Sequence, residues 1–318
     1  MRYSIKILII CSHRNYAPYT DYVAPFIYEQ MQGLKNLGCE FRVCFVKGGG
    51  LKSYWQAWKN MRKMIDAYQP DIVHAHYGLC CLLANMQRKV PVVSTYHGSD
   101  INDSKIRILS KIAIRLSKKN IFVSERLKNI VQKPSNSVVI PCGVDTSTFY
   151  PMNKEWCRRE LRMDMNKKYV LFSKAFNVWV KNYPLAKDSI DKLKYKGVDV
   201  ELVELKGYTR QQVVWLMNAC DCALMTSFNE GSPQFIKEAM ACNCPIVSTN
   251  VGDVKEVVAN MPDCYITAFD AEEIAQKIER CFWANIDKSN DMRRNKILLN
   301  YEQQVIAQRI KMLYVSVL

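Results

Sequence analysis

Short apolar runs alternate with amphipathic segments along the first half of the chain. Each run is bounded by polar or glycine-containing residues, as is typical of strands buried on both faces of a parallel sheet. Amphipathic helical patterns between the runs indicate strand–helix–strand units. The expected strands are Ile5–Cys11, Phe41–Val46, Ile72–Ala75, Val90–Thr95, Ile121–Val123 and Val138–Ile140.

The alternation is interrupted once, at "PCGVDTSTFYP", residues 141–151. It then restarts, which predicts two doubly wound α/β domains of Rossmann type facing an interdomain cleft. We expect domains at 1–150 and 151–300, followed by a last helical segment at 301–318. The strands expected in the second series are Tyr169–Ser173, Val198–Glu204, Cys222–Thr226 and Pro245–Thr249.

Length and composition agree with a globular protein of two domains. The chain has 318 residues, of which 49% are apolar and 24% charged. The sequence contains no run of about 18 uncharged apolar residues, so it predicts no membrane span. The start, "MRYSIKILIIC", lacks the pattern of a signal peptide and predicts a first strand. Thirteen cysteines, an odd number without an export signal, favour reduced thiols in the cytoplasm.

Charge is shared unevenly between the two halves. Residues 1–150 hold 21 Lys and Arg against 9 Asp and Glu, a net charge of +12, whereas residues 151–318 hold 24 against 21, or +3. The asymmetry indicates that the first domain meets an anionic surface or polyanion. No known nucleic-acid-binding module is present, so we expect no nucleic acid partner. A dehydrogenase is disfavoured because no Gly-x-Gly-x-x-Gly follows the first strand.

The stretch "SFNEGSPQFIKEAMACNCPIVST", residues 227–249, places two carboxylates eight positions apart, at Glu230 and Glu238. We expect Glu230 in the loop after a strand, Ser232 as the helix N-cap and Pro233 as the first helical residue. Helical spacing puts Glu238 away from the apolar face. The N–H groups at the start of this helix would suit phosphate oxygens.

That constellation resembles the E-x7-E motif of retaining glycosyltransferases of family 4, which have the GT-B fold. The segments "DIVHAHYG", "VVSTYHGSD" and "VIPCGVDTSTF" occur in the order of that family, ahead of the E-x7-E stretch. The resemblance implies that the last helix crosses back to the first domain. It also implies a nucleotide sugar, linked to UDP or GDP, as the donor substrate.

The resemblance assigns roles to individual residues. It implies that Glu238 accepts hydrogen bonds from ribose hydroxyls, and that Glu230 holds the sugar hydroxyls. Lys174 and Lys181 in "VLFSKAFNVWVKNYP" match the two basic positions for the diphosphate, although Lys174 stands where Arg is usual. His97 would contact the donor sugar near the reacting carbon. The donor-binding set is completed by the loop and helix start: Gly231, Ser232, Pro233, Gln234 and Phe235.

We expect no cofactor and no metal ion. The sequence contains no Asp-x-Asp triplet, and the Cys220/Cys222 and Cys242/Cys244 pairs have a gap too short for usual zinc sites. His74 and His76 would line the cleft from a strand end. The resemblance implies retention at the anomeric carbon. We hypothesise that the leaving phosphate takes the acceptor's proton and that Lys181, with the helix start at Ser232, stabilises the developing charge.

Two basic segments bear on the acceptor. In "SKIRILSKIAIRLSKKN", the cations Arg107, Lys111, Arg115 and Lys118 share one helical arc, while Ile106, Leu109, Ile112, Ala113 and Leu116 cover the opposite side. A second segment, "LKSYWQAWKNMRKMI", mixes aromatic and basic residues. We expect peripheral binding to the inner face of the cell membrane, with a glycan or lipid-linked saccharide as acceptor. A core helix with a solvated cationic face is the alternative.

The sequence leaves open the choice between two enzyme classes and the roles of three residues. A nucleotide-sugar epimerase of GT-B shape is the rival enzyme, since it needs a donor and no acceptor. Tyr208 is a candidate contact for the base, beside an expected capping box of Thr209 and Gln212. Tyr19 and Thr20 are candidates in the loop after the first strand, where the glycine pair frequent in the family is missing.

Overall fold

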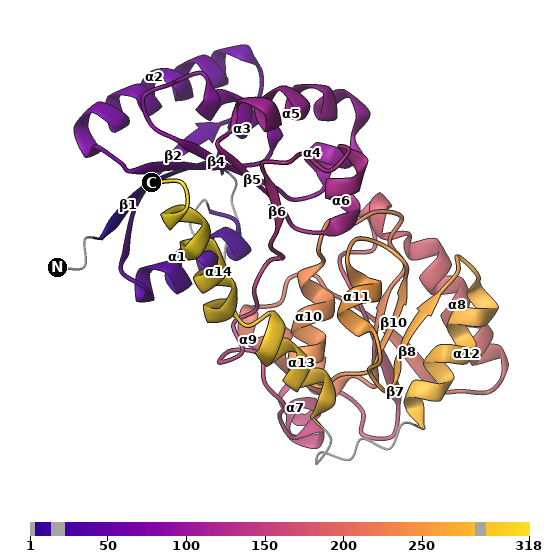
Figure 1. Ribbon diagram of the computed structural model, residues 1–318. Helices are drawn as coiled ribbons and strands as arrows, with labels where there is room; N and C mark the ends of the chain where they lie inside the picture. Colours follow the sequence, from indigo (N-terminus) through magenta and orange to yellow (C-terminus); the bar gives the residue numbers. More distant parts are fainter. Residues whose placement is uncertain (1–3, 14–22, 284–290) are drawn as a thin grey trace. The chain divides into compact units, whose positions relative to one another are not determined.

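The computed structural model describes residues 4–13, 23–283 and 291–318. The chain forms two compact units, one of Met1–Gly143 with Gln303–Leu318 and the other of Val144–Glu302. Each unit contains one parallel sheet flanked by helices (Figure 1). Tyr19 and Thr20 lie outside the described residues.

The first unit is built on a six-stranded sheet of order β2-β1-β3-β4-β5-β6, in which every pairing is parallel. Its strands are β1 (Ile5–His13), β2 (Cys39–Lys47), β3 (Ile72–His76), β4 (Val92–Tyr96), β5 (Lys119–Phe122) and β6 (Ser137–Val139). Its helices are α1 (Pro25–Asn36), α2 (Leu51–Tyr68), α3 (Gly78–Asn85), α4 (Ser99–Asn102), α5 (Ser104–Leu116), α6 (Glu125–Ile130) and α14 (Gln303–Val315).

Strand β1 shows why this sheet needs helices on both faces. Ile7 and Ile9 point into one core with α1 and α14, whereas Leu8 and Ile10 point into a second core with α2, α3 and α5. All four side chains are fully buried. An unbroken apolar run is therefore required, and the alternation of side chains divides it between the two layers.

The last helix, α14, packs in this unit beside α1 (Figure 1). Gln303 donates through Nε2 to the carbonyl oxygen of Glu29 at 2.7 Å. A Cβ atom at Gly33 of α1 would lie 3.0 Å from the Ala307 side chain of α14. The glycine therefore lets the two helices approach each other closely. The chain thus begins and ends in the same unit.

The second unit has a five-stranded parallel sheet of order β11-β10-β9-β7-β8. Helices α8 and α12 cover one face, and α9, α10 and α11 cover the other (Figure 1). Its strands are β7 (Lys168–Phe172), β8 (Val200–Glu204), β9 (Cys222–Met225), β10 (Ile246–Thr249) and β11 (Cys264–Thr267). Its helices are α7 (Lys154–Glu160), the short 3-10 turn η1 (Trp179–Lys181), α8 (Tyr183–Tyr195), α9 (Arg210–Ala219), α10 (Gln234–Ala241), α11 (Val254–Val258), α12 (Ala271–Phe282) and α13 (Met292–Asn300).

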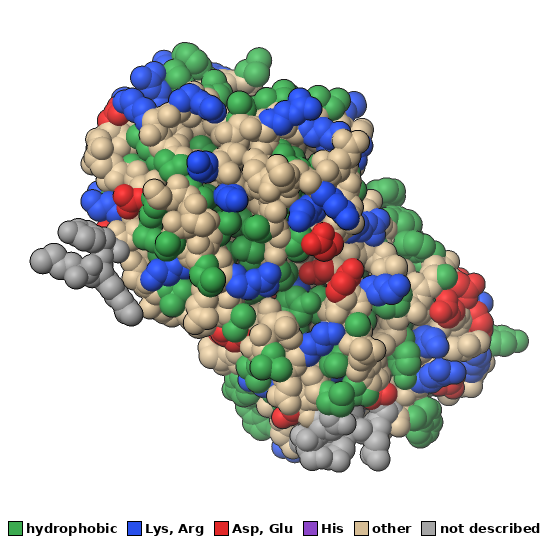
Figure 2. Space-filling view, in the orientation of Figure 1, with side chains coloured by type: hydrophobic (Ala, Val, Ile, Leu, Met, Phe, Trp, Pro, Cys, Tyr) green, Lys and Arg blue, Asp and Glu red, His purple; other side chains and the backbone are tan. Residues whose placement is uncertain are grey.

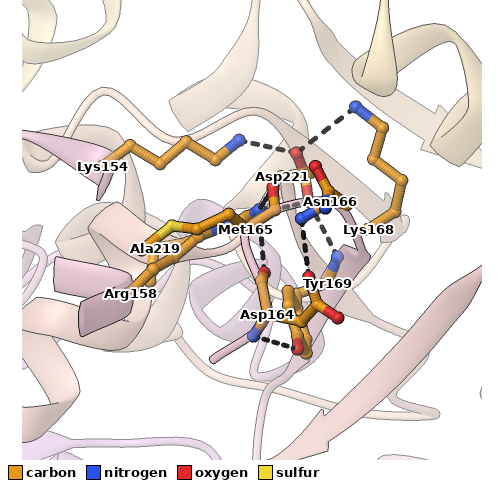
Figure 3. A network of polar contacts seen from close by, with 9 residues as sticks. All are labelled: Lys154, Arg158, Asp164, Met165, Asn166, Lys168, Tyr169, Ala219 and Asp221. Atoms are coloured by element: carbon orange, nitrogen blue, oxygen red, sulfur yellow. Dashed lines mark hydrogen bonds and ion pairs between the residues drawn. The ribbon is translucent and has the colours of Figure 1, made fainter. Parts of the chain in front are cut away.

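A buried polar network ties β7 to β9 at the amino ends of these strands (Figure 3). The carboxylate of Asp221 accepts from the guanidinium of Arg158 at 2.9 Å, the ammonium of Lys154 at 2.6 Å and the backbone N–H of Tyr169 at 2.7 Å. Arg158 also donates to three backbone carbonyls. Because the buried Asp221 is surrounded by donors, this network fixes the start of both strands.

The helical and strand pattern of the sequence located these elements to within a few residues. All ten expected strands form, and β11 is an additional strand that the sequence analysis missed. Its side chains are half-buried at the sheet edge, which leaves a weak apolar signal. No helix within residues 4–13, 23–283 and 291–318 combines the length and the apolar character that a membrane span requires.

Helix α5 buries only part of its apolar side, unlike the core helix of the alternative interpretation. Ala113 is buried, but Leu109, Ile112 and Leu116 are exposed beside the cations. The helix instead turns Ser110 and Ala113 toward its neighbours, and a carbon added at Gly78 of α3 would overlap the Ser110 hydroxyl. Close packing of small residues therefore decides the rotation of α5, and its larger apolar side chains are left at the surface.

Candidate active site

The second sheet has a topological switch point between β7 and β9. The chain leaves β7 for β8 on one side, whereas β9, β10 and β11 lie on the other. Loops that follow the two central strands diverge, and in such sheets ligands bind at this position. Lys174 and Lys181 follow β7, and Glu230 follows β9. The predicted residues of this unit therefore meet at the switch point.

Lys181 and Glu230 form an ion pair. Lys181 Nζ lies 2.5 Å from Glu230 Oε1, and the side chains are 15% and 16% exposed. Two further contacts hold the segments together: the Thr226 hydroxyl donates to the Lys181 carbonyl oxygen at 2.9 Å, and the Phe228 N–H donates to the carbonyl of Val180 at 2.9 Å. Sequence reasoning gave these two side chains separate roles and did not foresee their pairing.

Glu238 lies on α10, half-buried, among cations. Burial raises the pKa of its carboxyl, and the charges of Arg210, Lys237 and Lys174 act in the opposite direction. Arg210 is the first residue of α9 and was not among the predicted site residues. The available signal was a basic residue directly after Thr209, the N-cap of the predicted Thr209/Gln212 capping box, and the structure confirms that box.

The start of α10 differs from the prediction by one residue. Pro233, not Ser232, is the N-cap, and no side chain caps this helix. The Ser232 hydroxyl donates instead to Asp253 Oδ2 at 2.6 Å. Gly231, Ser232, Pro233 and Phe235 are buried, and Gln234 is half-buried. No N-cap side chain therefore competes with a ligand for the N–H groups at the start of α10.

A buried charged cluster stands behind this loop. Lys237 is fully buried, contacts the Ser232 hydroxyl through Nζ, and lies 3.6 Å from Asp253 Oδ2. Its ammonium also lies over the Tyr301 ring, 5.6 Å from the centroid. Burial raises the pKa of Asp253, while Lys237 lowers it. Sequence analysis missed this cluster, because Lys237 and Asp253 are 16 positions apart in elements that only the fold brings together.

Backbone packing holds the same loop from the other side. Gly252 has a φ of +58°, and a carbon added to it would lie 2.7 Å from the carbonyl oxygen of Gly231. Only glycine satisfies both the left-handed backbone and this approach. The loop that carries Glu230 is thus seated on the turn before α11.

Tyr208 lies before α9 and packs half-buried against the second unit's core. Burial raises the pKa of its phenol. Its contact with a nucleobase stays a prediction.

In the first unit, His97 follows β4 and is half-buried. His97 Nε2 lies 3.0 Å from His76 Nδ1, and Cys142 Sγ lies 3.9 Å from His97 Nδ1. Burial lowers the pKa of His97 to about 3, so the imidazole is neutral near pH 7. A neutral imidazole can act as hydrogen-bond donor and acceptor without adding charge.

The loop of His97 is fixed by the buried carboxylate of Asp100. It accepts from the backbone N–H of Gly98 at 2.8 Å and of His97 at 3.1 Å. Burial raises the Asp100 pKa to about 6, and these two hydrogen bonds oppose the rise.

The two histidines of β3 do not line an open surface, contrary to expectation. Both are fully buried. His74 Nδ1 lies 2.5 Å from the Tyr314 hydroxyl and Nε2 lies 2.7 Å from the Thr95 hydroxyl, which places His74 between β4 and α14. His76 supports His97 from within. His74 therefore packs α14 on the sheet, and His76 orients the imidazole of His97, which is predicted to contact the donor.

All 13 cysteines are free, and 11 are buried. Across 4–13, 23–283 and 291–318, no group of three or more His, Cys, Asp or Glu side chains is arranged to hold a metal ion.

Two family models match the chain, one in each unit. Residues 37–148 match Glycosyltransferase Family 4, and residues 177–282 match Glycosyl transferases group 1. The second region contains Lys181, Glu230 and Glu238.

Curated relatives are named as glycosyltransferases. A protein of Bacillus subtilis (strain 168) named as a teichuronic acid biosynthesis glycosyltransferase, TuaC, is 26% identical over 69% of this chain and 62% of its own length. An N,N'-diacetylbacillosaminyl-diphospho-undecaprenol alpha-1,3-N-acetylgalactosaminyltransferase of Campylobacter jejuni is 25% identical over 66% of this chain and 63% of its own length. The match thus spans less than two thirds of each of these relatives.

Solved structures agree on the fold over nearly the whole chain. A sucrose-phosphate synthase from Thermosynechococcus elongatus superposes with a TM-score of 0.80 and 16% identity, covering 98% of both chains. The Anabaena protein HepE in complex with UDP has a TM-score of 0.73 and 16% identity, covering 98% of this chain and 100% of its own. Together with the two parallel α/β units, these likenesses show the GT-B fold. The family models relate the chain to Glycosyltransferase Family 4 over residues 37–148 and to Glycosyl transferases group 1 over residues 177–282.

Proposed function

We propose that the protein is a retaining, metal-independent glycosyltransferase. It moves a sugar from a UDP- or GDP-linked donor to a glycan or lipid-linked saccharide during synthesis of a cell-surface polysaccharide. One observation carries the proposal: the Lys181–Glu230 pair lies at the switch point with the uncapped start of α10, and Glu238 follows on that helix among three cations.

The donor's negative charge is matched by positive groups of the second unit. Lys181, Lys174 and Arg210 supply cations, and the first turn of α10 supplies backbone N–H groups. These groups can hold a diphosphate and stabilise the charge that develops as the sugar departs. Metal independence is proposed on this positive charge and on the missing Asp-x-Asp triplet.

The carboxylate of Glu238 is suited to a vicinal diol such as that of ribose. An ionised carboxylate presents two acceptor oxygens, and each charge-assisted hydrogen bond contributes about 1.5–3 kcal/mol. Burial raises the pKa of Glu238, so donor affinity should fall on acidification at a pH above the ordinary value of 4.5. His97, neutral near pH 7, would contact the donor sugar by hydrogen bonding.

Retention is proposed from the family resemblance and from the place of Glu230. Its carboxylate is already paired with Lys181, which suits a group that holds sugar hydroxyls better than a free nucleophile. The leaving phosphate would then take the proton of the acceptor hydroxyl on the same face. Proton NMR of the first product formed shows whether the anomeric configuration is kept.

The acceptor and the cellular place are proposed from the relatives and the surface. The Campylobacter jejuni relative is named for a diphospho-undecaprenol-linked acceptor, and an Escherichia coli relative is a UDP-Gal:alpha-D-GlcNAc-diphosphoundecaprenol alpha-1,3-galactosyltransferase. Exposed apolar and cationic residues on α5 suit peripheral binding at the cytoplasmic face of the membrane.

Transfer is favoured over epimerisation because these relatives are named as transferases. Incubation with donor alone separates the two: epimerised nucleotide sugar would support the rival, and slow release of free sugar supports transfer.

The central test is a thermal-shift panel of UDP, GDP and ADP with their sugar conjugates, measured on wild type, Glu238→Gln and Glu256→Gln. Glu256 is an exposed glutamate of α11 in the same unit and serves as the matched control. We expect one nucleotide to raise the unfolding temperature of wild type and of the control, and Glu238→Gln to lose about tenfold in affinity. Equal binding by all three proteins contradicts the proposed role of Glu238. Turnover that disappears on exhaustive chelation and returns with a divalent ion contradicts metal independence.

A further inference from the structure

A pocket in the first unit lies between β2 and α2, away from the candidate active-site residues. It has a volume of about 650 Å³. Its floor is made by the small side chains of Cys44 on β2 and Ala57 on α2, where Cys44 Sγ lies 3.8 Å from the Ala57 carbonyl oxygen. Because β2 is the edge strand of the sheet, the groove is open along one side.

The groove is cationic. Lys47 at the end of β2, Lys52 in the first turn of α2 and Lys63 in its third quarter all line it, and no Asp or Glu does. None of these three lysines forms an ion pair within the described residues. Three uncompensated cations around one hollow attract an anion that carries more than one charge.

The rest of the lining divides into polar and apolar parts. Ser53, Gln56 and Asn60 lie one turn apart along α2 and offer hydroxyl and amide groups. Ala57 and Met64 of α2 supply the apolar part. A phosphate with a hydrocarbon substituent satisfies both parts, whereas a free inorganic anion would use only the first.

Apolar side chains continue from the groove onto the outer surface of α2. Leu51 is 92% exposed and Trp55 is 52% exposed. Trp55 stacks on Trp58 with centroids 4.9 Å apart, and Lys59 lies over Trp55 at 5.2 Å. Figure 2 shows Lys and Arg side chains gathered with apolar ones over this part of the unit. Exposed apolar residues interleaved with cations are typical of helices that bind at a lipid surface.

We propose that the groove between β2 and α2 binds the diphosphate and the first isoprene units of a polyisoprenyl-diphosphate-linked acceptor. The inference rests on the proposed function and names the anchor by which that acceptor is held. Lys47, Lys52 and Lys63 bind the diphosphate, Ser53 and Gln56 hydrogen-bond to its oxygens, and the apolar side chains of Ala57 and Met64 contact the chain. Such an anchor would hold the acceptor in the first unit independently of the donor.

Binding is tested without turnover by titration calorimetry with farnesyl diphosphate, inorganic pyrophosphate and farnesol. The groove variant is Lys52→Gln with Lys63→Gln, and the matched control is Lys59→Gln with Arg62→Gln. The control removes the same charge from the same helix at positions that do not line the groove. We expect farnesyl diphosphate to bind wild type more tightly than either fragment does. The groove variant should lose at least about tenfold in affinity, and the control less than about twofold.

A third variant, Gln56→Trp, fills the groove without changing the charge and should also weaken binding. Equal losses in the groove and control variants would mean a diffuse electrostatic effect and overturn the proposal. Pyrophosphate binding as tightly as farnesyl diphosphate would mean a site for a free anion and would overturn it too. Failure of the proposed function would appear differently, as wild-type protein that binds farnesyl diphosphate but transfers no sugar.

Discussion

Lys181 Nζ and Glu230 Oε1 lie 2.5 Å apart in a mostly buried ion pair that joins the segment after β7 to the loop after β9. Each group is proposed to contact a different part of the donor, the diphosphate for Lys181 and the sugar for Glu230. Since they bind each other, the position of one depends on the other. Recognition of phosphate and of sugar should therefore be coupled.

Replacing Lys181 by Met should lower kcat/KM for transfer by about 10²-fold, because it removes a cation from the leaving group and leaves the Glu230 carboxylate without its partner. Glu230→Gln should also be impaired, and the double variant should lose less than the product of the single losses. Steady-state kinetics of the four proteins measures the coupling. Lys194→Met, at an exposed position of α8, is the control. Strictly multiplicative losses would show that the ion pair has no functional role.

Gly252→Ala should destabilise the protein and weaken donor binding. The substitution strains a backbone at φ +58° and pushes a carbon to within 2.7 Å of the Gly231 carbonyl. Gly197→Ala is the matched control, since its φ is +83° but nothing lies within 4 Å of the added carbon. The control should cost about 1–2 kcal/mol in free energy of unfolding, and Gly252→Ala more than about 3 kcal/mol. Urea unfolding distinguishes them, and equal costs would contradict the close approach.

Lys237→Met should cost about 3–5 kcal/mol in free energy of unfolding, because Asp253 would be left as a buried charge without its cation. Adding Asp253→Asn should recover much of this loss, since the uncompensated charge is then removed. Lys255→Met, at an exposed position of α11, should change the free energy by less than about 0.5 kcal/mol. Urea unfolding at pH 7 measures all four proteins. A double variant less stable than Lys237→Met would show that the cluster is not held by charge pairing.

Much of the fold follows from local patterns. Unbroken apolar runs such as Ile7–Ile10 are required by a sheet covered on both faces, and they were located from sequence. Strand β11 escaped because an edge strand with half-buried residues lacks such a run. The rotation of α5 escaped because the fit of Ser110 against Gly78, not apolar content, decides it.

The candidate site was predicted to a similar extent. The family resemblance assigned Glu230 and Lys181 to one donor site, but no local pattern shows that they pair. The Lys237–Asp253 contact and the proximity of Arg210 to Glu238 depend on tertiary packing between separate elements. Sequence alone also assigned the N-cap to Ser232, whose hydroxyl is engaged by Asp253.

Acidification should destabilise the first unit through its buried histidines. Burial lowers the pKa of His74 and His97 to about 3, and lowers that of His76 well below 6.5. In the unfolded chain these groups take up protons near pH 6.5. The unfolded state therefore binds more protons between about pH 6.5 and 3, and stability falls as the pH falls through that range. Asp100 has a pKa raised from 3.8 to about 6. Between these two pH values the folded state holds one more proton at this group than the unfolded state, which opposes the trend.

His74→Gln should therefore reduce the slope of unfolding free energy against pH by about 1.4 kcal/mol per pH unit, between roughly pH 4 and 6. Asp100→Asn should have the opposite effect and steepen the slope. Urea unfolding of both variants and wild type at pH 6.5, 5.5 and 4.5 checks the two signs. Parallel slopes in all three proteins would contradict the buried, neutral state of His74.

Reversing charge on α5 should weaken binding to anionic vesicles. Leu109, Ile112 and Leu116 are 39%, 44% and 41% exposed, next to the cations Lys111 and Arg115. Apolar side chains that remain at the surface among cations favour insertion into the headgroup region over a merely solvated face. The exposed apolar side chains thus favour the membrane interpretation that charge alone had left open.

Co-sedimentation with phosphatidylglycerol vesicles at low salt compares wild type with Lys111/Arg115/Lys118→Glu. Each cation near the leaflet contributes about 1 kcal/mol, so the variant should lose at least about 100-fold in partition coefficient. Lys187/Lys192/Lys194→Glu on α8 changes the charge equally in the other unit and should bind nearly as wild type. Ile112→Ser with Leu116→Ser should weaken the part of the binding that persists at high salt, where charge attraction is screened. Equal losses in the two charge variants would mean that net charge, not the surface of α5, determines binding.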